Sequence, residues 1–381
     1  MLRCEKFYNV LASKGFNYFT GVPDSTFKSW MSFLDDNSNS SNLTHRIAAI
    51  ERDAIAWAAG YNVATGKVGV VYMQNSGLGN TINPITSLTD PEVYKIPLLL
   101  MIGWRGEPGK KDEPQHIKMG KITLEQLDVL GIKYDFLPAE IEAAEKVITE
   151  ARSYIDQTGE PFALVIRKGL FEPYQSKKSN QQQYEMKRED SIKLVINQLK
   201  SKDIVVSTTG KASREVFEHR EVRGESHEKD FLMVGSMGCA SSFAAEIALQ
   251  KPDRSVYIFD GDGAVIMSEG SLSTIGHYSP KNLFHIVFDN DSYESTGGQP
   301  TTASTVNFEQ LALANGYKHT RSVETNENLI TTFQEMDSLK GPKMLIVKVA
   351  KGARKELGRP TTTPIQNKKA FRGFLDSEST E

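Results

Sequence analysis

The sequence predicts an α/β protein built from two doubly wound domains, each with a parallel sheet. In both halves of the chain, short apolar runs alternate with segments whose apolar residues recur at helical spacing. The most polar and least periodic stretch, residues 176–190, lies between these halves. A chain of 381 residues is also long for one core. We therefore expect one domain over residues 1–175, a linker over 176–190, and a second domain over 191–381.

The first half contains four runs that predict strands and three segments that predict helices. The expected strands are residues 16–22 (FNYFTGV), 68–74 (VGVVYMQ), 96–104 (IPLLLMIGW) and 161–169 (PFALVIRKG). The expected helices are residues 1–16, 49–66 and 139–155. The first of these helices is amphipathic and lacks the continuous apolar core of a signal peptide.

The second half repeats this alternation. The expected strands are residues 203–210 (DIVVSTTG), 255–261 (SVYIFDG), 282–290 (NLFHIVFDN) and 343–350 (KMLIVKVA). Helices are expected around residues 190–200, 239–250, 268–277 and 325–336. The C-terminal segment, 351–374, is basic and rich in turn residues, so we expect a solvated tail.

Composition excludes several classes of protein. The formal net charge is −3 and no long basic stripe is visible, so we expect no nucleic-acid partner. No apolar run approaches the roughly 20 residues that a membrane span needs, so we expect no membrane association. The two cysteines, Cys4 and Cys239, are far apart and show no metal-binding spacing. These features predict a cytoplasmic protein.

Carboxylates and glycines interrupt an apolar run at Asp260-Gly261-Asp262-Gly263. In open parallel sheets, ligands bind beyond the carboxyl ends of the strands, which is where Asp262 is expected. The next expected strand ends at Asn290, 28 residues after Asp262, with room for one crossover helix. These two side chains and a backbone carbonyl near Ser292 would offer Mg²⁺ three oxygen ligands, and a diphosphate could complete the site. Taken alone, the GDG tripeptide also fits a solvated turn.

This pairing resembles the diphosphate-binding motif of thiamine-diphosphate enzymes, and two other segments support the resemblance. Residues 49–67 (AIERDAIAWAAGYNVATGK) are similar to the family's activating glutamate and the small-residue helix that follows it. Residues 234–238 (VGSMG) are similar to the segment that bends the cofactor. The residues that the resemblance assigns to the cofactor are Glu51, Gly235, Ser236, Met237, Gly261, Gly263 and Ala264.

The resemblance also implies particular roles. Glu51 would hydrogen-bond the aminopyrimidine ring, the Gly235 carbonyl would accept from the cofactor amine, and Met237 would wedge between the two rings. Two structural alternatives stay open. Met is a common core filler, and a carboxylate at the start of a helix is favoured by the helix dipole. A NAD-binding dehydrogenase is disfavoured, because no GxGxxG follows the first strand of either half.

Five further segments resemble the phosphonopyruvate decarboxylase family: residues 21–30, 112–123, 208–221, 294–302 and 357–364. The resemblance implies a pyrimidine-binding first domain, a diphosphate-binding second domain and no domain between them. It also implies a carbon–carbon lyase of phosphonate biosynthesis. This enzyme would use the thiamine diphosphate ylid to convert 3-phosphonopyruvate to phosphonoacetaldehyde and CO₂. The alternatives are sulfopyruvate decarboxylase and, less favoured, a carboligating enzyme of the same cofactor class.

The family resemblance also assigns catalytic roles to Asp24 in GVPDS and to His116 in DEPQH, both of which would approach the reactive carbon. A neutral imidazole near a carboxylate suits a proton relay. The structural alternatives are a helix cap for Asp24 and a solvated loop residue for His116. The phosphonate requires cationic or amide donors, and the candidates are Arg105, Lys168, Gly297, Gly298, Arg354 and Arg359.

The resemblance finally implies an assembly. The two cofactor half-sites fall on different halves of the chain. In this family the site forms between the first half of one subunit and the second half of another. We therefore expect a homodimer or a larger homo-oligomer, with a small 2-oxo acid as substrate.

Overall fold

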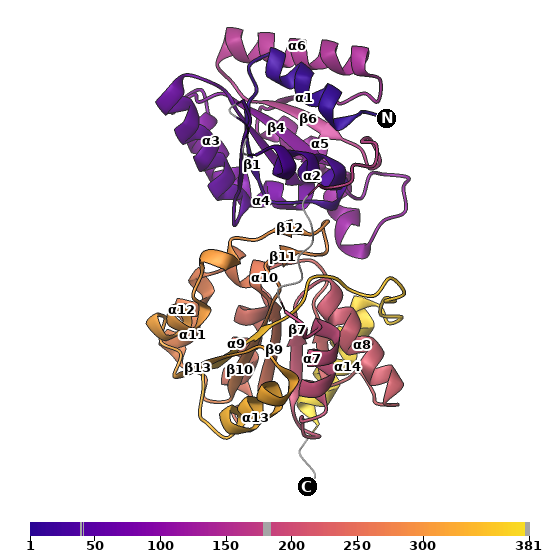
Figure 1. Cartoon of the computed structure of the whole chain (residues 1–381), viewed down its shortest axis with the longest axis vertical. Helices are drawn as coiled ribbons and strands as arrows, with labels where there is room; N and C mark the ends of the chain where they lie inside the picture. Colours follow the sequence, from indigo (N-terminus) through magenta and orange to yellow (C-terminus); the bar gives the residue numbers. More distant parts are fainter. Residues whose placement is uncertain (39, 41, 178–183, 378–381) are drawn as a thin grey trace. The chain divides into compact units, whose positions relative to one another are not determined.

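The computed structural model covers residues 1–381 and describes all of them except 39, 41, 178–183 and 378–381. The chain divides into two compact units, Met1–Ser179 and Asn180–Glu381 (Figure 1). Six residues of the expected linker, 178–183, lie outside the described residues, and its last three, 188–190, belong to a helix.

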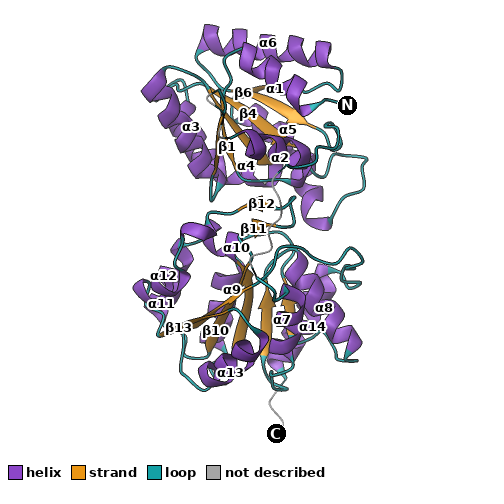
Figure 2. Ribbon diagram, in the orientation of Figure 1, coloured by secondary structure: helices purple, strands orange, loops and turns teal. Residues whose placement is uncertain are grey.

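A six-stranded parallel sheet forms the centre of the first unit (Figure 2). Its strand order is β2-β1-β3-β4-β6-β5, with the bounds β1 (Tyr18–Gly21), β2 (Thr44–Ile47), β3 (Gly69–Gln74), β4 (Leu98–Gly103), β5 (Lys133–Phe136) and β6 (Phe162–Ile166). The four strands expected from apolar runs, β1, β3, β4 and β6, are confirmed. The apolar pattern misses β2 and β5 because both are only partly buried and carry polar residues.

Helices cover both faces of this sheet (Figure 2). Val70 and Tyr72 of β3 belong to one buried cluster and Val71 to another, because successive strand residues point to opposite faces. The first cluster includes residues of α1 (Cys4–Ser13), α2 (Lys28–Asn37) and α6 (Ile141–Thr158), and the second includes residues of α3 (Glu51–Thr65), α4 (Leu78–Pro84) and α5 (Pro114–Val129). Short turns lie at η1 (Ser25–Phe27), η2 (Asn75–Gly77) and η3 (Ile85–Thr89).

The second unit contains another six-stranded parallel sheet, with the order β13-β14-β10-β9-β7-β8. Its strands are β7 (Ile204–Ser207), β8 (Asp230–Leu232), β9 (Val256–Gly261), β10 (Leu283–Asp289), β13 (His319–Val323) and β14 (Lys343–Lys348). A short antiparallel pair, β11 (Ser292–Tyr293) and β12 (Gln299–Pro300), follows β10. The described helices are α7 (Arg188–Ile196), α8 (Lys211–Val222), α9 (Ala240–Gln250), α10 (Asp262–Met267), α11 (Gly270–Tyr278), α12 (Phe308–Ala314), α13 (Asn326–Asp337) and α14 (Pro364–Asp376), with a short helical turn at η4 (Ala303–Thr305).

These two sheets confirm the predicted fold class. Among the described residues, no further domain lies between the two units. No helix in the described part of the chain is long and apolar enough to cross a bilayer.

The expectation of a solvated C-terminal tail over 351–374 is wrong from residue 364 onward, because these residues belong to α14 (Pro364–Asp376). Thr363 and Gln366 make a capping box at the start of this helix. Asn367 makes two hydrogen bonds with the backbone of β8. Its Nδ2 donates to the Asp230 carbonyl at 2.8 Å, and its Oδ1 accepts from the Leu232 amide at 3.2 Å. The helix therefore packs against the edge strand of the second sheet, although its sequence is basic.

Candidate active site

Glu51 is the first residue of α3, and its side chain is buried (6% exposed). Its Oε2 accepts a hydrogen bond from Asn80 Nδ2 at 2.7 Å. A Cβ added at Gly77 would lie 2.3 Å from Glu51 Oε1, so the carboxylate occupies the space that a side chain would take there. The start of α3 favours a negative charge at this position. Residues of η2 and α4 thus hold the Glu51 carboxylate in one place.

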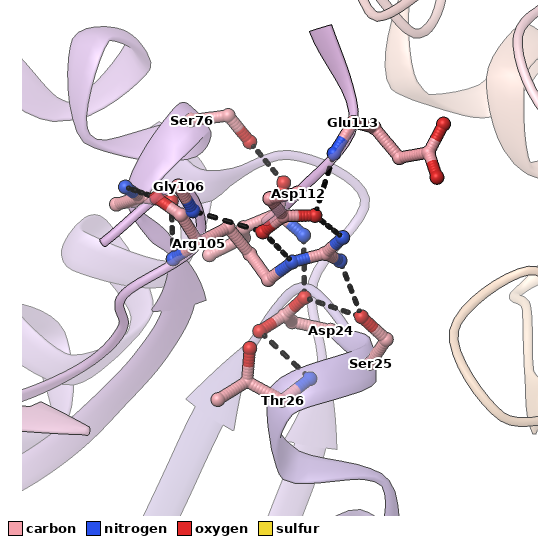
Figure 3. Close-up of polar contacts among 10 residues, drawn as sticks. Asp24, Ser25, Thr26, Ser76, Arg105, Gly106, Asp112 and Glu113 are labelled. Atoms are coloured by element: carbon pink, nitrogen blue, oxygen red, sulfur yellow. Dashed lines mark hydrogen bonds and ion pairs between the residues drawn. The ribbon is translucent and has the colours of Figure 1, made fainter. Parts of the chain in front are cut away.

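Asp24 lies after β1 and is fully buried. Its Oδ2 accepts from the Thr26 amide at 3.1 Å, so it does cap η1 (Figure 3). Its Oδ1 accepts from Gln74 Nε2 at 2.5 Å and from Ser25 Oγ at 3.4 Å. A Cβ at Gly103 would lie 2.4 Å from Oδ2. Asp24 therefore meets groups from the carboxyl ends of β3 and β4 in addition to its own turn.

Arg105 is paired with Asp112 close to this turn (Figure 3). Its Nε and Nη2 donate to the two Asp112 oxygens at 2.8 and 2.5 Å, and its Nη1 donates to Ser25 Oγ at 2.8 Å. The hydrogen bond from Arg105 holds the pKa of Asp112 well below its usual range. The charge of Arg105, a candidate for binding the substrate anion, is therefore matched within the protein.

His116 lies in the first turn of α5 and is buried (8% exposed). Burial, and then the positive charge of Arg105, lower the pKa of His116, while the charges of Asp112 and Asp24 act in the opposite direction. The imidazole is thus neutral at pH 7. Within the described residues its Nδ1 has no hydrogen-bond partner. The structure therefore gives His116 a neutral imidazole whose Nδ1 lacks a hydrogen-bond partner among the described residues, and it places this ring close enough to Asp24 for the charge of Asp24 to affect its pKa.

In the second unit, Asp262 and Asn290 follow two neighbouring strands. β9 and β10 are adjacent and parallel, with Gly261 opposite Phe288. Asp262 and Asn290 come directly after these strands and are 2% and 4% exposed. Asn290 Oδ1 accepts from the amide of Ser292 at 3.0 Å, which leaves a second lone pair on this oxygen. The two buried side chains therefore lie at the carboxyl edge of the sheet.

The surroundings of the Asp262 carboxylate disfavour its ionised form. Burial, and then the negative charge of Asp289, raise the pKa of Asp262 to about 7. Asp289 itself is paired with Lys348 Nζ at 2.5 Å. A bound cation would offset the remaining buried charge. No group of three His, Cys, Asp or Glu side chains in the described residues could hold a metal. One carboxylate with neutral oxygens from Asn290 and Ser292 is a set that fits Mg²⁺.

The glycines that flank Asp262 meet different surroundings. A Cβ added at Gly263 would lie 2.7 Å from the Tyr293 ring. At Gly261, by contrast, no atom lies within 4 Å of an added Cβ. Ala264 is 4% exposed, in the first turn of α10. The strand end is therefore packed on the side of Gly263 and open beside Gly261, which leaves room for a ligand against the backbone.

The segment between β8 and α9 contains a backbone conformation that is unusual for its residue type. Ser236 has a φ of 48°, which costs free energy for a residue other than glycine and is often found at functional sites. A Cβ added at Gly238 would lie 2.3 Å from Ser268 Oγ, so the segment packs against the end of α10. Met237 is half-buried, and the Gly235 amide donates to Thr209 Oγ1 at 3.0 Å. The roles expected for these residues toward a cofactor stay predictions.

The basic candidates for the substrate anion differ in their surroundings. Lys168 is exposed in the turn after β6 and makes no hydrogen bond or ion pair with the described residues. Arg354 is paired with Glu189 at 3.0 Å and with Glu218. Arg359 is exposed and also has an interaction partner. Lys168 is therefore the candidate with a charge that the described structure leaves unmatched.

The amides of Gly297 and Gly298, which are candidate donors to the substrate anion, are used within their own loop. Both amides donate to the Tyr293 carbonyl, at 3.3 and 3.0 Å, and the Thr296 amide donates to the same oxygen at 3.2 Å. A nest requires amides that point outward. The sequence identified a glycine-rich loop correctly, but it could not show that the loop turns back on itself.

Four residues of the site were not predicted from the sequence: Gln74, Asn80, Asp112 and Thr301. The first two lie in a polar run, QNSGLGN, that begins at the last residue of the buried strand β3. A polar run at the carboxyl end of a central parallel strand is a signal for site residues. Asp112 and Thr301 lie in loops, and only their contacts reveal them: Asp112 pairs with Arg105, and the Thr301 hydroxyl donates to Asp262.

Comparisons with known proteins agree with this division of the chain. The family model "Thiamine pyrophosphate enzyme, N-terminal TPP binding domain" matches residues 4–128. The model "Thiamine pyrophosphate enzyme, C-terminal TPP binding domain" matches residues 208–347. Both units thus define a thiamine-diphosphate enzyme.

Three relatives are similar over most of their length. Phosphonopyruvate decarboxylase of Streptomyces viridochromogenes is 33% identical over 340 residues, which cover 85% of this chain and 83% of that protein. The enzyme of the same name from Streptomyces hygroscopicus is 30% identical over 379 residues, with 96% and 92% covered. Sulfopyruvate decarboxylase of Methanosarcina acetivorans is 26% identical over 397 residues, with 98% and 97% covered. The chain belongs to the phosphonopyruvate decarboxylase family of thiamine-diphosphate-dependent decarboxylases.

Proposed function

We propose that this protein decarboxylates 3-phosphonopyruvate to phosphonoacetaldehyde and CO₂, using thiamine diphosphate and Mg²⁺. The observation that carries this proposal is the identity of 33% and 30% with two phosphonopyruvate decarboxylases, against 26% with a sulfopyruvate decarboxylase. In the reaction, the bond between the carboxylate carbon and the keto carbon breaks. The keto carbon then takes up a proton and becomes the aldehyde carbon.

Glu51 is proposed to hydrogen-bond the aminopyrimidine ring. When bound, thiamine diphosphate supplies the carbanion that attacks the keto carbon and the electron sink for the pair that CO₂ leaves behind. The task of Glu51 is to hold and release a proton at a fixed carboxylate oxygen. Support comes from its burial and from the single orientation that Asn80 and Gly77 impose on it.

Mg²⁺ is proposed to bind Asp262, Asn290 and the Ser292 carbonyl. Their burial and oxygen chemistry support this proposal, because a buried carboxylate without a countercharge favours a cation. The backbone around residues 261–264 would hold the diphosphate. The segment Gly235-Ser236-Met237 would contact the rings.

Asp24 and His116 are proposed to handle protons beside the substrate. His116 is neutral, so one ring nitrogen can donate a proton while the other accepts one. Asp24 keeps its position because Gln74 and the Thr26 amide hold its two oxygens. Both residues lie at the carboxyl edge of the first sheet, where ligands of such sheets bind.

Lys168 is proposed as the first contact for the phosphonate, which carries up to two negative charges. Its turn follows β6, which is adjacent to β4, so its backbone lies at the same sheet edge as Asp24. An unmatched ammonium gains more from a phosphonate than Arg105 or Arg354, whose charges already have carboxylate partners.

A homodimer or larger homo-oligomer is proposed to complete the site. The outer surface of α3 supports this proposal, because Trp57 and Val63 are 54% and 74% exposed. Ala56, Gly60 and Ala64 on the same helix are exposed as well. Small and apolar residues on the outer surface of a helix are typical of a surface that another subunit covers.

A substrate panel tests the proposed reaction. The purified protein, loaded with thiamine diphosphate and Mg²⁺, would receive 3-phosphonopyruvate, sulfopyruvate or pyruvate, and release of CO₂ and of the free aldehyde would be followed. We expect the highest kcat/KM for 3-phosphonopyruvate. A higher value for sulfopyruvate would favour the sulfonate enzyme instead. Formation of a carboligation product in place of the aldehyde would overturn the proposed reaction.

A further inference from the structure

A buried hydrogen bond joins Thr301 to Asp262. Thr301 Oγ1 lies 2.5 Å from Asp262 Oδ2, and the two residues are 7% and 2% exposed. The threonine hydroxyl donates this hydrogen bond, and the carboxylate oxygen accepts it. The two residues are 39 positions apart in the chain. The contact is therefore created by the fold and is not a local turn.

Thr301 ends the loop that begins beside Asn290. The Thr301 amide donates to the Asp291 carbonyl at 3.2 Å, and Ser292 pairs with Pro300 across β11 and β12. The loop thus closes on itself, with its first and last residues bonded. As a consequence, the position of the Thr301 hydroxyl is coupled to the position of the Asn290–Ser292 turn.

The middle of this loop is anchored to the rest of the second unit at two points. Glu294 Oε2 accepts from Arg188 Nη1 at 2.5 Å, and the same guanidinium forms two hydrogen bonds with Glu215. The Tyr293 ring packs on the Cα of Gly263, where an added Cβ would lie only 2.7 Å away. The loop is therefore fixed next to Asp262 by contacts on both sides, and its hydroxyl donor has a defined place.

We propose that Thr301 is a positioning residue that orients the Asp262 carboxylate for Mg²⁺. The inference rests on the proposed role of Asp262 as a metal ligand. By donating to Oδ2, the hydroxyl fixes the plane of the carboxylate and links it to the turn that supplies the other two oxygens. Metal ligands commonly depend on such supporting hydrogen bonds, and loss of one typically weakens metal binding by about 10- to 100-fold.

Two pairs of variants isolate the hydroxyl. Thr301→Val replaces it with a methyl group of similar size in the wild-type background. Thr301→Ala and Thr301→Ser differ from one another by the hydroxyl alone. For each protein, binding of thiamine diphosphate would be measured by calorimetry over a series of Mg²⁺ concentrations, without substrate. Far-UV circular dichroism would verify that each variant is folded.

We expect Thr301→Val to need about 10- to 100-fold more Mg²⁺ than the wild type for half-maximal cofactor binding. Thr301→Ala should likewise need more Mg²⁺ than Thr301→Ser, by a comparable factor. Each pair tests the hydroxyl by itself, so the other pair still gives a result if one of the variants fails to fold. Equal Mg²⁺ requirements within both pairs would overturn the role of Thr301 and leave the metal site in place. Cofactor binding by the wild type that does not depend on Mg²⁺ would overturn the metal site as well.

Discussion

Glu51 packs so closely against Gly77 that a methyl group added at position 77 would test whether the orientation of the Glu51 carboxylate matters for activity. The Cβ of Gly77→Ala would lie 2.3 Å from Glu51 Oε1, so the carboxylate must move. We expect kcat/KM to fall by about 100-fold, because a displacement near 1 Å of a catalytic group has effects of this size.

Gly79→Ala is the matched control for this variant. No atom lies within 4 Å of a Cβ added at Gly79, in the same short helix region. Its activity should stay at the wild-type level, while the free energy of unfolding rises by up to about 1 kcal/mol, since alanine favours helix. If Gly77→Ala were as active as this control, Glu51 would not need the orientation that we assign to it.

Because His116 is buried, we expect it to lower the free energy of unfolding as the pH falls. Burial lowers its pKa in the folded protein below the unfolded value of about 6.5. Its contribution to stability is therefore complete above pH 6.5 and is lost as the pH falls toward the folded pKa. Urea unfolding of the wild type should show a steeper loss of stability below pH 6.5 than that of His116→Gln. Above pH 7.5 the difference between the two proteins should not change with pH, and an opposite slope at low pH would contradict the burial of this imidazole.

At the residue scale, the sequence predicts which groups have the right chemistry but not what they contact. Asp24 and Glu51 are recognisable by residue type and position in a motif. The pairing of Arg105 with Asp112 depends on a loop fold that no periodicity encodes. The same is true of the Thr301 hydroxyl, which reaches Asp262 across 39 residues.

At the scale of elements, Arg188 connects three parts of the second unit. It starts α7 and donates to Glu215 in α8 and to Glu294 after β11. Arg188 and Glu215 are 7% and 2% exposed. Arg188→Met would leave Glu215 buried without its partner, so we expect the free energy of unfolding to fall by about 3–5 kcal/mol, measured by urea titration.

Arg372→Met serves as the control for Arg188→Met. Arg372 pairs with Asp376 on the surface of α14, and its side chain is 72% exposed. Such pairs contribute little, so we expect a change below about 1 kcal/mol. Equal effects of the two variants would show that the buried network does not hold α7, α8 and the loop together.

Strands that are buried on both faces were predictable from the sequence, and strands with exposed polar residues were not. β9 and β10 appear in the sequence as apolar runs because the sheet is covered on both sides. β13 reads HTRSV, with two exposed residues at its centre, and lacks such a run. α14 was missed because its basic composition outweighs the capping signal at Thr363, although Phe371 is buried.

At the scale of the whole molecule, the alternation of strands and helices was sufficient to predict two parallel sheets. In each unit, polar residues follow the carboxyl ends of central strands. These strands are β1 and β3 in the first unit and β9 and β10 in the second. Assembly is not encoded in such local patterns.

Complementation between two inactive variants tests the central claim that Glu51 of one subunit and Asp262 of another serve the same cofactor. Glu51→Gln and Asp262→Ala should each abolish decarboxylation of 3-phosphonopyruvate as homo-oligomers. In a mixed dimer, one of the two sites would combine an intact Glu51 with an intact Asp262. After co-expression and random mixing, we expect about a quarter of the wild-type activity. No recovery of activity in verified mixed oligomers would contradict the shared site.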